Sequence, residues 1–247
     1  MKTVPHILLL AGSAEARRVA EALEARVSRY VAWLSEAPRG AAPLPQIPVL
    51  KRFESGAQMQ QAMAQGGFGA VIDAGHVFDR STTARAQVAA VALGLPYLRI
   101  ERPCWEIGDW PNALRAPDVA AACALVPEGV RVFATTGWDS LADYAGFRGA
   151  RLLLRQTRRH ARQAQFDFAE PVFGDPPFSA AQEEALFKHL RVDLLICRNL
   201  GGKASRAKLD AAAALGCGII LIDRPALARD VPRVPCVDAA LAWLEAL

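Results

Sequence analysis

Cysteine is scarce in this sequence and follows no recognisable spacing. The 247 residues include five cysteines, an odd number, and no two of them are arranged as C-x-x-C. This pattern excludes a disulfide framework and the common structural zinc sites, so free thiols in a reducing compartment and no metal site are expected. The cysteines are Cys104, Cys123, Cys197, Cys217 and Cys236.

Long apolar runs are also absent. The longest are short stretches such as Ile7–Ala11 and Ile219–Ile222, whereas a membrane-spanning helix needs about 20 apolar residues. The N-terminal stretch carries one lysine and too brief an apolar segment for a signal peptide. A cytoplasmic protein with no membrane contact is therefore expected.

The sequence does contain enough apolar material for a core, and it is rich in arginine. Hydrophobic residues make up 52% and charged residues 22%, which excludes a disordered or fibrous chain. The length fits one large domain or two of roughly 120 residues each. The formal net charge is +4, and arginines greatly outnumber lysines. Guanidinium groups suit bidentate capture of carboxylates or phosphates, although the enrichment is equally consistent with a GC-rich genome.

Short apolar runs alternate with alanine-rich helical patterns along the whole chain. Strands buried on both faces read as continuous apolar runs, so the alternation predicts parallel α/β sheets. The pattern lapses over Pro103–Pro117 and then resumes. This predicts two tandem Rossmann-like (flavodoxin-like) domains, residues 1–109 and 110–247, with a ligand cleft between them. The expected strands are Val4–Leu10, Arg29–Leu34, Ala70–Asp73, Tyr97–Ile100, Arg131–Ala134, Arg151–Leu154, Val192–Cys197 and Gly218–Ile222. The expected helices are Ala14–Ala25, Gly56–Gln65, Ser81–Leu93, Ser140–Ala145, Ser179–Leu190, Ala204–Leu215 and Val237–Leu247, with Ser179 and Gln182 forming a capping box.

The first strand-to-helix turn is the most informative local feature. Gly12, Ser13, Ala14 and Glu15 follow the first strand and open a helix. Small residues there expose backbone N–H groups and the positive end of the helix to an anion. The turn is neither G-x-G-x-x-G nor a Walker A loop. Phosphate binding is the functional interpretation, and a plain tight turn is the alternative.

The segment after the second strand contains Ser35, Glu36 and Arg39. In nucleotide-binding α/β folds this position meets the adenosine ribose, where an arginine accommodates a 2′-phosphate and an acidic residue favours NAD. Ser35 and Arg39 are interpreted as the adenosine end of an NADP site. Glu36 argues for NAD instead, and a surface arginine is the alternative for Arg39.

Asp73 and His76 lie at the end of a later strand, where ligand contacts are expected. Both are interpreted as substrate contacts. The alternative for His76 is a hydrogen-bonded structural histidine.

Two loops of the second half carry similar signals. Thr136 and Gly137 follow a strand and precede a helix, and two glycines flanked by cations lie between Val192–Cys197 and the next helix. This composition is typical of an anion cradle, and flexible loops with solvated charges are the alternative. The second loop contains Arg198, Asn199, Gly201, Gly202 and Lys203.

A basic run extends from Arg151 to Arg162 and includes His160. It suits a polyanionic small molecule. No nucleic-acid-binding fold signature accompanies it, so nucleic acid is not an expected partner.

Five ordered segments resemble the precorrin-6A reductase family of cobalamin (corrin ring) biosynthesis, and together they span nearly the whole chain. The most similar is Gly94–Pro103 with Trp105, which resembles L-G-x-P-x-L-R-x-E-R-P-x-W. The others are Ile7–Ala16, similar to an apolar strand followed by G-G-T-x-E-A; Val71–Phe78, similar to V-D-A-T-H-P-F; Val132–Gly137, similar to V-F-L-T-T-G-R; and Arg198–Asp210, similar to K-N-S-G-G-x-A-T-x-A-K-L-D.

The resemblance implies two Rossmann-like domains that hold NADPH and a macrocycle rich in carboxylates. It implies an oxidoreductase that transfers a hydride from the nicotinamide to a ring double bond of precorrin-6A. A proton is added at the neighbouring carbon, which gives precorrin-6B. Because the cofactor carries the hydride, the protein orients the reactants and supplies at most one proton donor. A monomer or a weak homodimer is expected.

The resemblance also implies roles for the residues described above. Gly12, Ser13, Ala14 and Glu15 would hold a cofactor phosphate. His76 is the candidate proton donor, and an ordered water is the alternative. The other cofactor-site residues would be Ser35, Arg39, Thr136, Gly137, Gly201, Gly202 and Lys203, and the substrate contacts would be Asp73, His76, Arg198 and Asn199.

Departures from the family's motifs leave a second hypothesis open. Gly75-His76-Val77 stands in place of T-H-P, Trp138 follows Gly137 where the family has arginine, and Leu200 stands in place of a serine. A non-catalytic tetrapyrrole- or nucleotide-binding paralogue would bind its ligand without oxidising NADPH. A generic reductase of small substrates is less expected, because no Tyr-x-x-x-Lys pattern is present.

Overall fold

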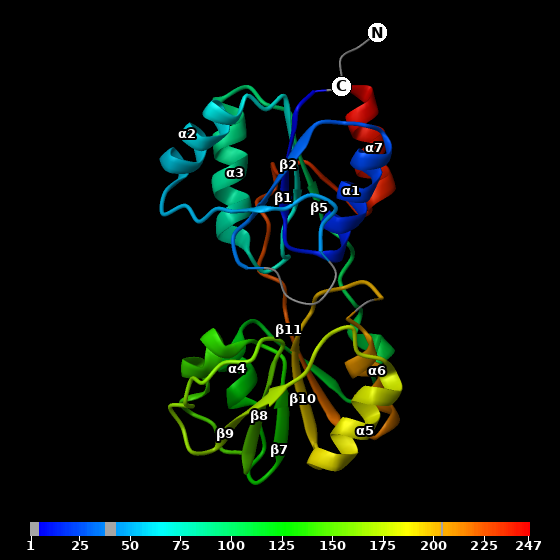
Figure 1. The fold of residues 1–247 in the computed structure, drawn as a ribbon. Coiled ribbons are helices and arrows are strands. Elements are labelled where there is room, and N and C mark those ends of the chain that lie inside the picture. Colours follow the sequence, from blue (N-terminus) through cyan, green and yellow to red (C-terminus); the bar gives the residue numbers. More distant parts are fainter. Residues whose placement is uncertain (1–4, 38–42, 204) are drawn as a thin grey trace. The chain divides into compact units, whose positions relative to one another are not determined.

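The computed structural model describes residues 5–37, 43–203 and 205–247, and these residues form two α/β units (Figure 1). The first unit takes in the described residues up to Pro103 together with Ala226–Leu247, and the second takes in the described part of Cys104–Pro225. Each unit is built on one six-stranded sheet. None of the helices in the described part of the chain combines the length and the hydropathy needed to cross a membrane.

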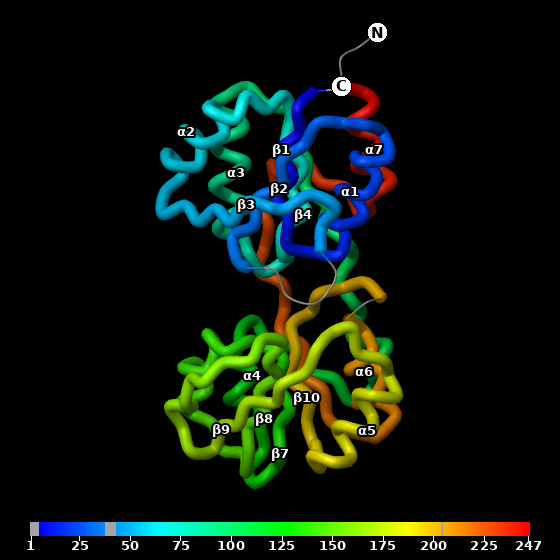
Figure 2. Tube along the Cα trace, in the orientation of Figure 1, coloured from blue at the N-terminus to red at the C-terminus, as the bar shows by residue number. Residues whose placement is uncertain are grey.

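The sheet of unit 1 has the strand order β12-β5-β4-β1-β2-β3, and neighbouring strands are parallel. Figure 2 traces β1, β2, β3 and β4 of this sheet. β1 pairs with β2 on one side and with β4 on the other. The strands are β1 (Ile7–Ala11), β2 (Tyr30–Leu34), β3 (Val49–Leu50), β4 (Ala70–Ala74), β5 (Tyr97–Ile100) and β12 (Arg233–Val234).

Helices cover both faces of this sheet because its strands are apolar on both sides. In β1, Ile7 and Leu9 join the core under α1 and α7, and Leu8 and Leu10 join the core under α2 and α3. In Figure 1, α1 and α7 lie together on one side of the sheet and α2 and α3 on the other. The helices are α1 (Ala14–Ala25), α2 (Gly56–Gly66), α3 (Arg80–Ala92) and α7 (Val237–Ala246).

The sheet of unit 2 is also parallel and has the order β6-β11-β10-β7-β8-β9. Helices α5 (Ala180–Leu190) and α6 (Ala207–Ala214) bury Phe187 and Leu209 against β7, β8, β10 and β11. Figure 1 shows α4 (Val119–Ala124) on the other side of this sheet, and the 3₁₀ helix η2 (Trp138–Tyr144) contacts it. The strands are β6 (Ala113–Ala116), β7 (Arg131–Ala134), β8 (Arg151–Gln156), β9 (Ala169–Phe173), β10 (Leu194–Arg198) and β11 (Gly218–Ile222), and the short 3₁₀ helix η1 (Ile107–Asp109) precedes β6.

Each sheet has one point where the strand order reverses. In unit 1, β1 lies between β2 and β4, and in unit 2, β7 lies between β8 and β10. The loops that leave the carboxyl ends of β1 and β4, or of β7 and β10, therefore diverge to opposite faces. In open α/β sheets ligands bind in the crevice that such a switch point creates.

The predicted class, two parallel-sheet α/β domains, is confirmed. The predicted spans of α1, β5, β7 and β11 match the structure residue for residue. The capping box at the start of α5 is also present, with Ser179 accepting from the backbone N–H of Gln182. The segment expected to be a helix over Ser140–Ala145 is instead the 3₁₀ helix η2.

The predicted domain boundary at residue 109 is wrong in two respects. The first unit ends at Pro103, and β6 already belongs to the sheet of unit 2, although its sequence lies in the segment interpreted as a junction. The chain then returns to unit 1, where β12 pairs with β5 and α7 buries Leu244 in the core under α1. The reason is that β6 is an edge strand with two exposed middle residues, one of them Arg115, and β12 has only two residues. Neither strand forms an apolar run in the sequence.

Candidate functional site

The loop between β1 and α1 is fixed to the neighbouring loop after β4. The Ser13 hydroxyl caps α1 by accepting the Ala16 N–H at 3.3 Å, and it donates to the Ala74 carbonyl at 2.7 Å. A Cβ atom at Gly12 would lie only 2.9 Å from the backbone nitrogen of His76. Glycine is therefore required for the two loops to approach each other at the switch point of unit 1.

The first turn of α1 offers N–H groups to an anion at this edge. Helix geometry leaves the N–H groups of Ala14 and Glu15 without partners inside the helix, and the helix dipole makes this end positive. The Glu15 carboxylate forms an ion pair with Arg102, from the segment after β5. The guanidinium therefore offsets the only acidic charge in the first turn. The sequence alone does not indicate this ion pair, because Glu15 and Arg102 are 87 positions apart.

Asp73, at the carboxyl end of β4, is a buried and fully occupied carboxylate. Only 1% of the residue is exposed. Its Oδ1 accepts from the Gly75 N–H at 2.9 Å and from Arg99 at 2.6 Å, and its Oδ2 accepts from Tyr97 at 2.7 Å and from Thr83 at 2.8 Å. These bonds use the acceptor capacity of a carboxylate. The expectation that Asp73 contacts substrate does not fit this burial, and the residue instead positions the loop that follows β4.

Arg99 connects Asp73 to a second carboxylate and to the backbone of the same loop. Its side chain is fully buried, and its Nε donates to Glu101 at 3.1 Å. Its Nη2 donates to the carbonyl oxygens of Gly75 and His76 at 3.4 and 3.5 Å. Glu101 also accepts two hydrogen bonds from Arg80, at 2.8 and 3.1 Å. The loop that carries His76 is thus held by a network of ion pairs.

Tyr97 is a permanent hydrogen-bond donor in this network. Burial, together with the nearby Asp73 carboxylate, raises the pKa of Tyr97 well above its ordinary value. The phenol therefore stays protonated at neutral pH, and it keeps its bond to Asp73.

His76 lies half-buried at the same edge, beside the Gly12 loop. Its Nδ1 accepts the Phe78 N–H at 3.3 Å, which places the proton of the neutral ring on Nε2. The backbone carbonyl of His76 accepts the Asp79 N–H at 2.8 Å. The ring is thereby oriented by its own turn.

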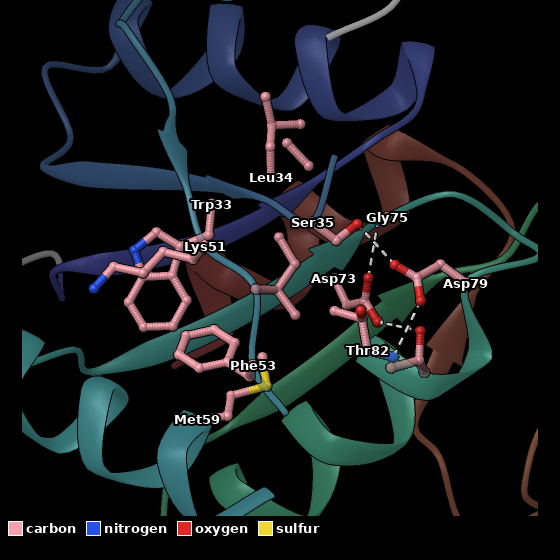
Figure 3. A pocket seen from close by; sticks show the side chains of 13 residues that line it. Trp33, Leu34, Ser35, Lys51, Phe53, Met59, Asp73, Gly75, Asp79 and Thr82 are labelled. Atoms are coloured by element: carbon pink, nitrogen blue, oxygen red, sulfur yellow. Dashed lines mark hydrogen bonds between the residues drawn. The ribbon is translucent and has the colours of Figure 1, made fainter. Parts of the chain in front are cut away.

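Ser35 follows β2 and lines a narrow pocket at the same end of the sheet (Figure 3). Its hydroxyl donates to Asp79 Oδ2 at 2.8 Å, and Asp79 caps α3 by accepting the Thr82 N–H at 3.2 Å. Burial acts to raise the pKa of Asp79, but the hydrogen bonds from Thr82, Ser35 and Ser81 outweigh it and lower that pKa below its ordinary value. Arg39, predicted to lie near Ser35, is outside the described residues.

The corresponding loop after β7 in unit 2 is held by neutral hydroxyl groups. Ser140 donates to Thr136 Oγ1 at 2.8 Å, and the Tyr144 hydroxyl lies 3.1 Å from the same oxygen. Thr136 is almost completely buried, and its hydroxyl shapes the loop from inside. Gly137, with φ of 86°, makes the turn into η2 in a conformation that favours glycine.

The loop after β10 is fastened to Trp105. Asn199 accepts the Trp105 N–H at 2.9 Å and donates to the Trp105 carbonyl at 3.0 Å, and the Trp105 indole N–H donates to the Gly202 carbonyl at 2.9 Å. Asn199 is buried, so it is a positioning residue and not the direct substrate contact that was predicted. Arg198 is half-buried at the end of β10, and Gly202 and Lys203 are exposed.

The basic run of residues 151–162 is not one continuous surface. Arg151 and Arg155 lie on β8, where they pair with Glu170 and Glu183. The rest belongs to the irregular segment after β8. There, the His160 ring lies 4.5 Å from Trp138 and 5.4 Å from Phe173, measured between ring centroids. The exposed cations of this segment are Arg158, Arg159 and Arg162.

The predicted residues thus gather at the carboxyl edges of two sheets. Within residues 5–37, 43–203 and 205–247, no group of three His, Cys, Asp or Glu side chains is arranged to hold a metal ion. The edge of unit 1 brings together Gly12, Ser13, Ala14, Glu15, Ser35 and His76, and that of unit 2 brings together Thr136, Gly137, Arg198, Asn199, Gly201, Gly202 and Lys203.

Fold and loops together define a protein of the two-domain, Rossmann-like class with an anion-accepting helix start in unit 1. Comparison with known proteins narrows this class. The family described as Precorrin-6x reductase CbiJ/CobK matches residues 6–245. The chain is similar to the precorrin-6A reductase of Mycobacterium tuberculosis (strain CDC 1551 / Oshkosh), with 34% identity over 242 residues and 98% of each chain covered. It is also similar to the precorrin-6A reductase of Rhodococcus erythropolis, with 33% identity over 251 residues and 98% of each chain covered.

A solved structure supports the same relationship. The structure described as CobK precorrin-6A reductase superposes with a TM-score of 0.90 at 28% identity, covering 98% of this chain and 96% of that one. The chain therefore belongs to the precorrin-6x reductase family, which comprises oxidoreductases of cobalamin biosynthesis. The resemblance stated from the motifs is confirmed.

Proposed function

We propose that this protein reduces a ring double bond of precorrin-6A to give precorrin-6B, with NADPH as the reductant. Membership of the family, over nearly the whole chain, carries the proposal. The substrate is the one in the names of the similar proteins. The loops at the switch point of unit 1 supply the local support, because they combine a close backbone approach with an anion-accepting helix start.

The residues at the edge of unit 1 fit a dinucleotide. The N–H groups at the start of α1 suit the pyrophosphate, and Arg102 adds a cation beside them through its pair with Glu15. Ser35, at the end of β2, suits the adenosine ribose. When bound, the nicotinamide of this cofactor supplies the hydride. Roles in binding the cofactor for Thr136, Gly137, Gly201, Gly202 and Lys203 of unit 2 stay predictions.

The macrocycle substrate carries several carboxylates, and the edge of unit 2 has cations to receive them. The half-buried Arg198 ends β10, and the exposed Arg158 and Arg159 belong to the segment after β8. Guanidinium groups bind carboxylates through paired hydrogen bonds. We assign these cations to substrate binding.

The proton that completes the reduction needs a donor, and we assign it to His76. Its Nδ1 already accepts a hydrogen bond, so Nε2 is the nitrogen that carries the proton. Asp73 and Arg99 contribute by fixing the loop that carries His76. Their role is positioning, since neither side chain is exposed.

Turnover with the authentic macrocycle tests the function. The purified protein is mixed with precorrin-6A and NADPH, and the loss of nicotinamide absorbance is followed together with the mass of the macrocycle. We expect one NADPH to be oxidised for each macrocycle that gains two hydrogens. A folded protein that binds the macrocycle without oxidising NADPH would instead be the non-catalytic paralogue.

The role of His76 is tested separately. General acid catalysis contributes roughly 100- to 10,000-fold, so we expect His76→Ala to lower turnover by at least about 100-fold and to remove a pH-dependent limb of the rate profile. His189→Ala removes an exposed histidine of α5 and serves as the control. Unchanged turnover of His76→Ala across pH would assign proton donation to an ordered water.

A further inference from the structure

The segment after β3 places two cations beside the carboxyl end of β2. Lys51 follows β3 directly, and its backbone N–H donates to the Leu34 carbonyl at 2.8 Å. Arg52 then reaches across, and its Nε donates to the Ser35 carbonyl at 3.1 Å. The backbone of Lys51 and the guanidinium of Arg52 therefore lie at the position where nucleotide-binding α/β folds meet the adenosine ribose.

This placement is held by contacts on three sides. The Lys51 ammonium lies 5.4 Å from the centroid of the Trp33 ring, and the Phe53 ring lies 5.4 Å from the same ring. Figure 3 shows Lys51 and Phe53 beside Trp33 at the wall of the pocket that Ser35 also lines. From α3, Arg85 donates to the Phe53 carbonyl at 2.8 Å.

Charge pairing distinguishes these two cations from several arginines of unit 1. Arg26, Arg80, Arg99 and Arg102 each form an ion pair with a carboxylate. No described carboxylate forms an ion pair with Lys51 or Arg52. Arg52 is exposed, so its guanidinium is accessible to an anion from solution.

The adenosine ribose of NADPH differs from that of NADH by a 2′-phosphate. The Arg52 guanidinium at the Ser35 carbonyl suits this dianion, because charge-assisted hydrogen bonds are the strong ones. The Lys51 ammonium over the Trp33 ring adds a second positive charge at the same end of β2.

Two acids lie near these cations in the sequence. Glu36 follows Ser35, at the position typical of NAD sites, and the exposed Glu54 lies two residues after Arg52. The Asp79 carboxylate is engaged by the α3 cap and by Ser35.

We infer that Lys51 and Arg52 bind the 2′-phosphate and set the preference of this protein for NADPH over NADH. The inference rests on the proposed function for the identity of the cofactor. Arg39, in the segment after β2, was expected to select the cofactor. The inference assigns this role to the segment after β3, whose two cations outweigh the negative charge of Glu36.

Binding of two adenosine fragments tests the inference without the macrocycle. Adenosine 2′,5′-bisphosphate and AMP differ only in the 2′-phosphate, and isothermal titration measures the affinity of each. We expect the wild-type protein to prefer the bisphosphate by at least about 10-fold. Arg52→Ala should weaken the bisphosphate about 10-fold and leave AMP within about 2-fold, and the double variant Lys51→Ala/Arg52→Ala should remove the preference.

Arg29→Ala is the matched control. Arg29 is an exposed arginine that precedes β2, so it lies at the opposite end of the same strand, about 20 Å from Ser35 at roughly 3.3 Å per residue. Its removal changes the net charge equally and should change neither affinity. Arg52→Lys should retain part of the preference, because a single positive charge remains.

Three outcomes would overturn the inference. Loss of affinity for both fragments in Arg52→Ala would show a structural effect. A preference unchanged in the double variant but lost in Arg39→Ala would place the phosphate at the segment after β2. A wild-type protein that binds both fragments equally would exclude a 2′-phosphate site. A protein that shows the predicted selectivity but does not reduce precorrin-6A would refute only the proposed reaction, and a reductase that uses NADH equally well would refute only the selectivity.

Discussion

The two units share the order of five strands but stabilise their switch points with different chemistry. The shared order is β3-β2-β1-β4-β5 in unit 1 and β9-β8-β7-β10-β11 in unit 2. The sixth strand, at the edge, differs, because β12 is the last strand of unit 1 in the chain and β6 is the first strand of unit 2. In unit 1 the loop after β4 is held by the buried charges of Asp73 and Arg99. In unit 2 the loops after β7 and β10 are held by the hydroxyl of Thr136 and the amide of Asn199.

The comparison shows that the topology of the sheet sets the position of each loop. The side-chain interactions set how strongly that loop is stabilised. A buried charge left without its partner costs several kcal/mol of stability. A loop held by an ion-pair network is therefore sensitive to the loss of one partner. Neutral hydrogen bonds carry a smaller penalty when they are broken. Unit 2 also has a buried ion pair, Arg155 with Glu183, but it lies on β8 and α5, one strand away from the switch point.

The strongest test of this contrast removes the central cation of unit 1. Arg99→Met keeps the approximate volume of the side chain and leaves Asp73 buried without its guanidinium. We expect a loss of about 3–5 kcal/mol in the free energy of unfolding, the usual cost of breaking a buried pair. Urea unfolding measures it.

The control for this variant is Arg115→Met. Arg115 pairs with Asp223 at 2.8 Å, but both side chains are substantially exposed. Exposed pairs contribute about 1 kcal/mol or less. Similar losses in the two variants would contradict the view that burial gives the unit 1 network its weight.

A second variant measures the neutral counterpart in unit 2. Asn199→Leu leaves the buried N–H and carbonyl of Trp105 without partners. We expect a loss of about 2 kcal/mol, within the range for unsatisfied buried groups. Asn112→Ala, at an exposed asparagine of the same unit, should change stability by less than about 0.5 kcal/mol. A loss for Asn199→Leu as large as that for Arg99→Met would erase the contrast between the units.

Much of the fold could be predicted because the interior strands are recognisable in the sequence. β1, β4, β10 and β11 are continuous apolar runs, and parallel strands buried on both faces need such runs. The loops that follow them could also be located, since glycine and small polar residues interrupt the pattern. The edge strands β3 and β12 could not, because two residues of backbone pairing leave no periodic signal.

The sequence predicted where the site residues lie, but it did not predict their hydrogen-bond partners. Asp73 and Asn199 were correctly placed at the ends of strands, yet the sequence could not show that their polar atoms are already used. Asp73 meets Arg99, 26 positions away, and Asn199 meets Trp105, 94 positions away. A polar residue at a strand end looks the same whether it faces a ligand or another strand, and only the fold decides. Arg102 was missed for the same reason, because its partner Glu15 lies 87 positions away.

The smallest expected change in the free energy of unfolding comes from the helix caps. Unit 1 has a charged cap and unit 2 has a neutral one. Asp79 caps α3 and Ser179 caps α5. Replacing either by alanine should lower the free energy of unfolding by about 1 kcal/mol at pH 7. The pKa of Asp79 is lowered in the folded protein, so its contribution is fully present above the ordinary pKa of 3.8 and is lost as the pH falls through the folded value.

The contributions of the two caps to the free energy of unfolding should therefore differ at acidic pH. Urea unfolding of Asp79→Ala and the wild-type protein should give curves whose difference is constant above about pH 5 and shrinks below about pH 4, near the ordinary range for aspartate. The difference for Ser179→Ala should stay constant over the same range, because a hydroxyl does not titrate there. A Ser179→Ala difference that shrinks in step with that of Asp79→Ala would mean that acid weakens the units as a whole. In that case the pH dependence would not report the charge at the edge of unit 1.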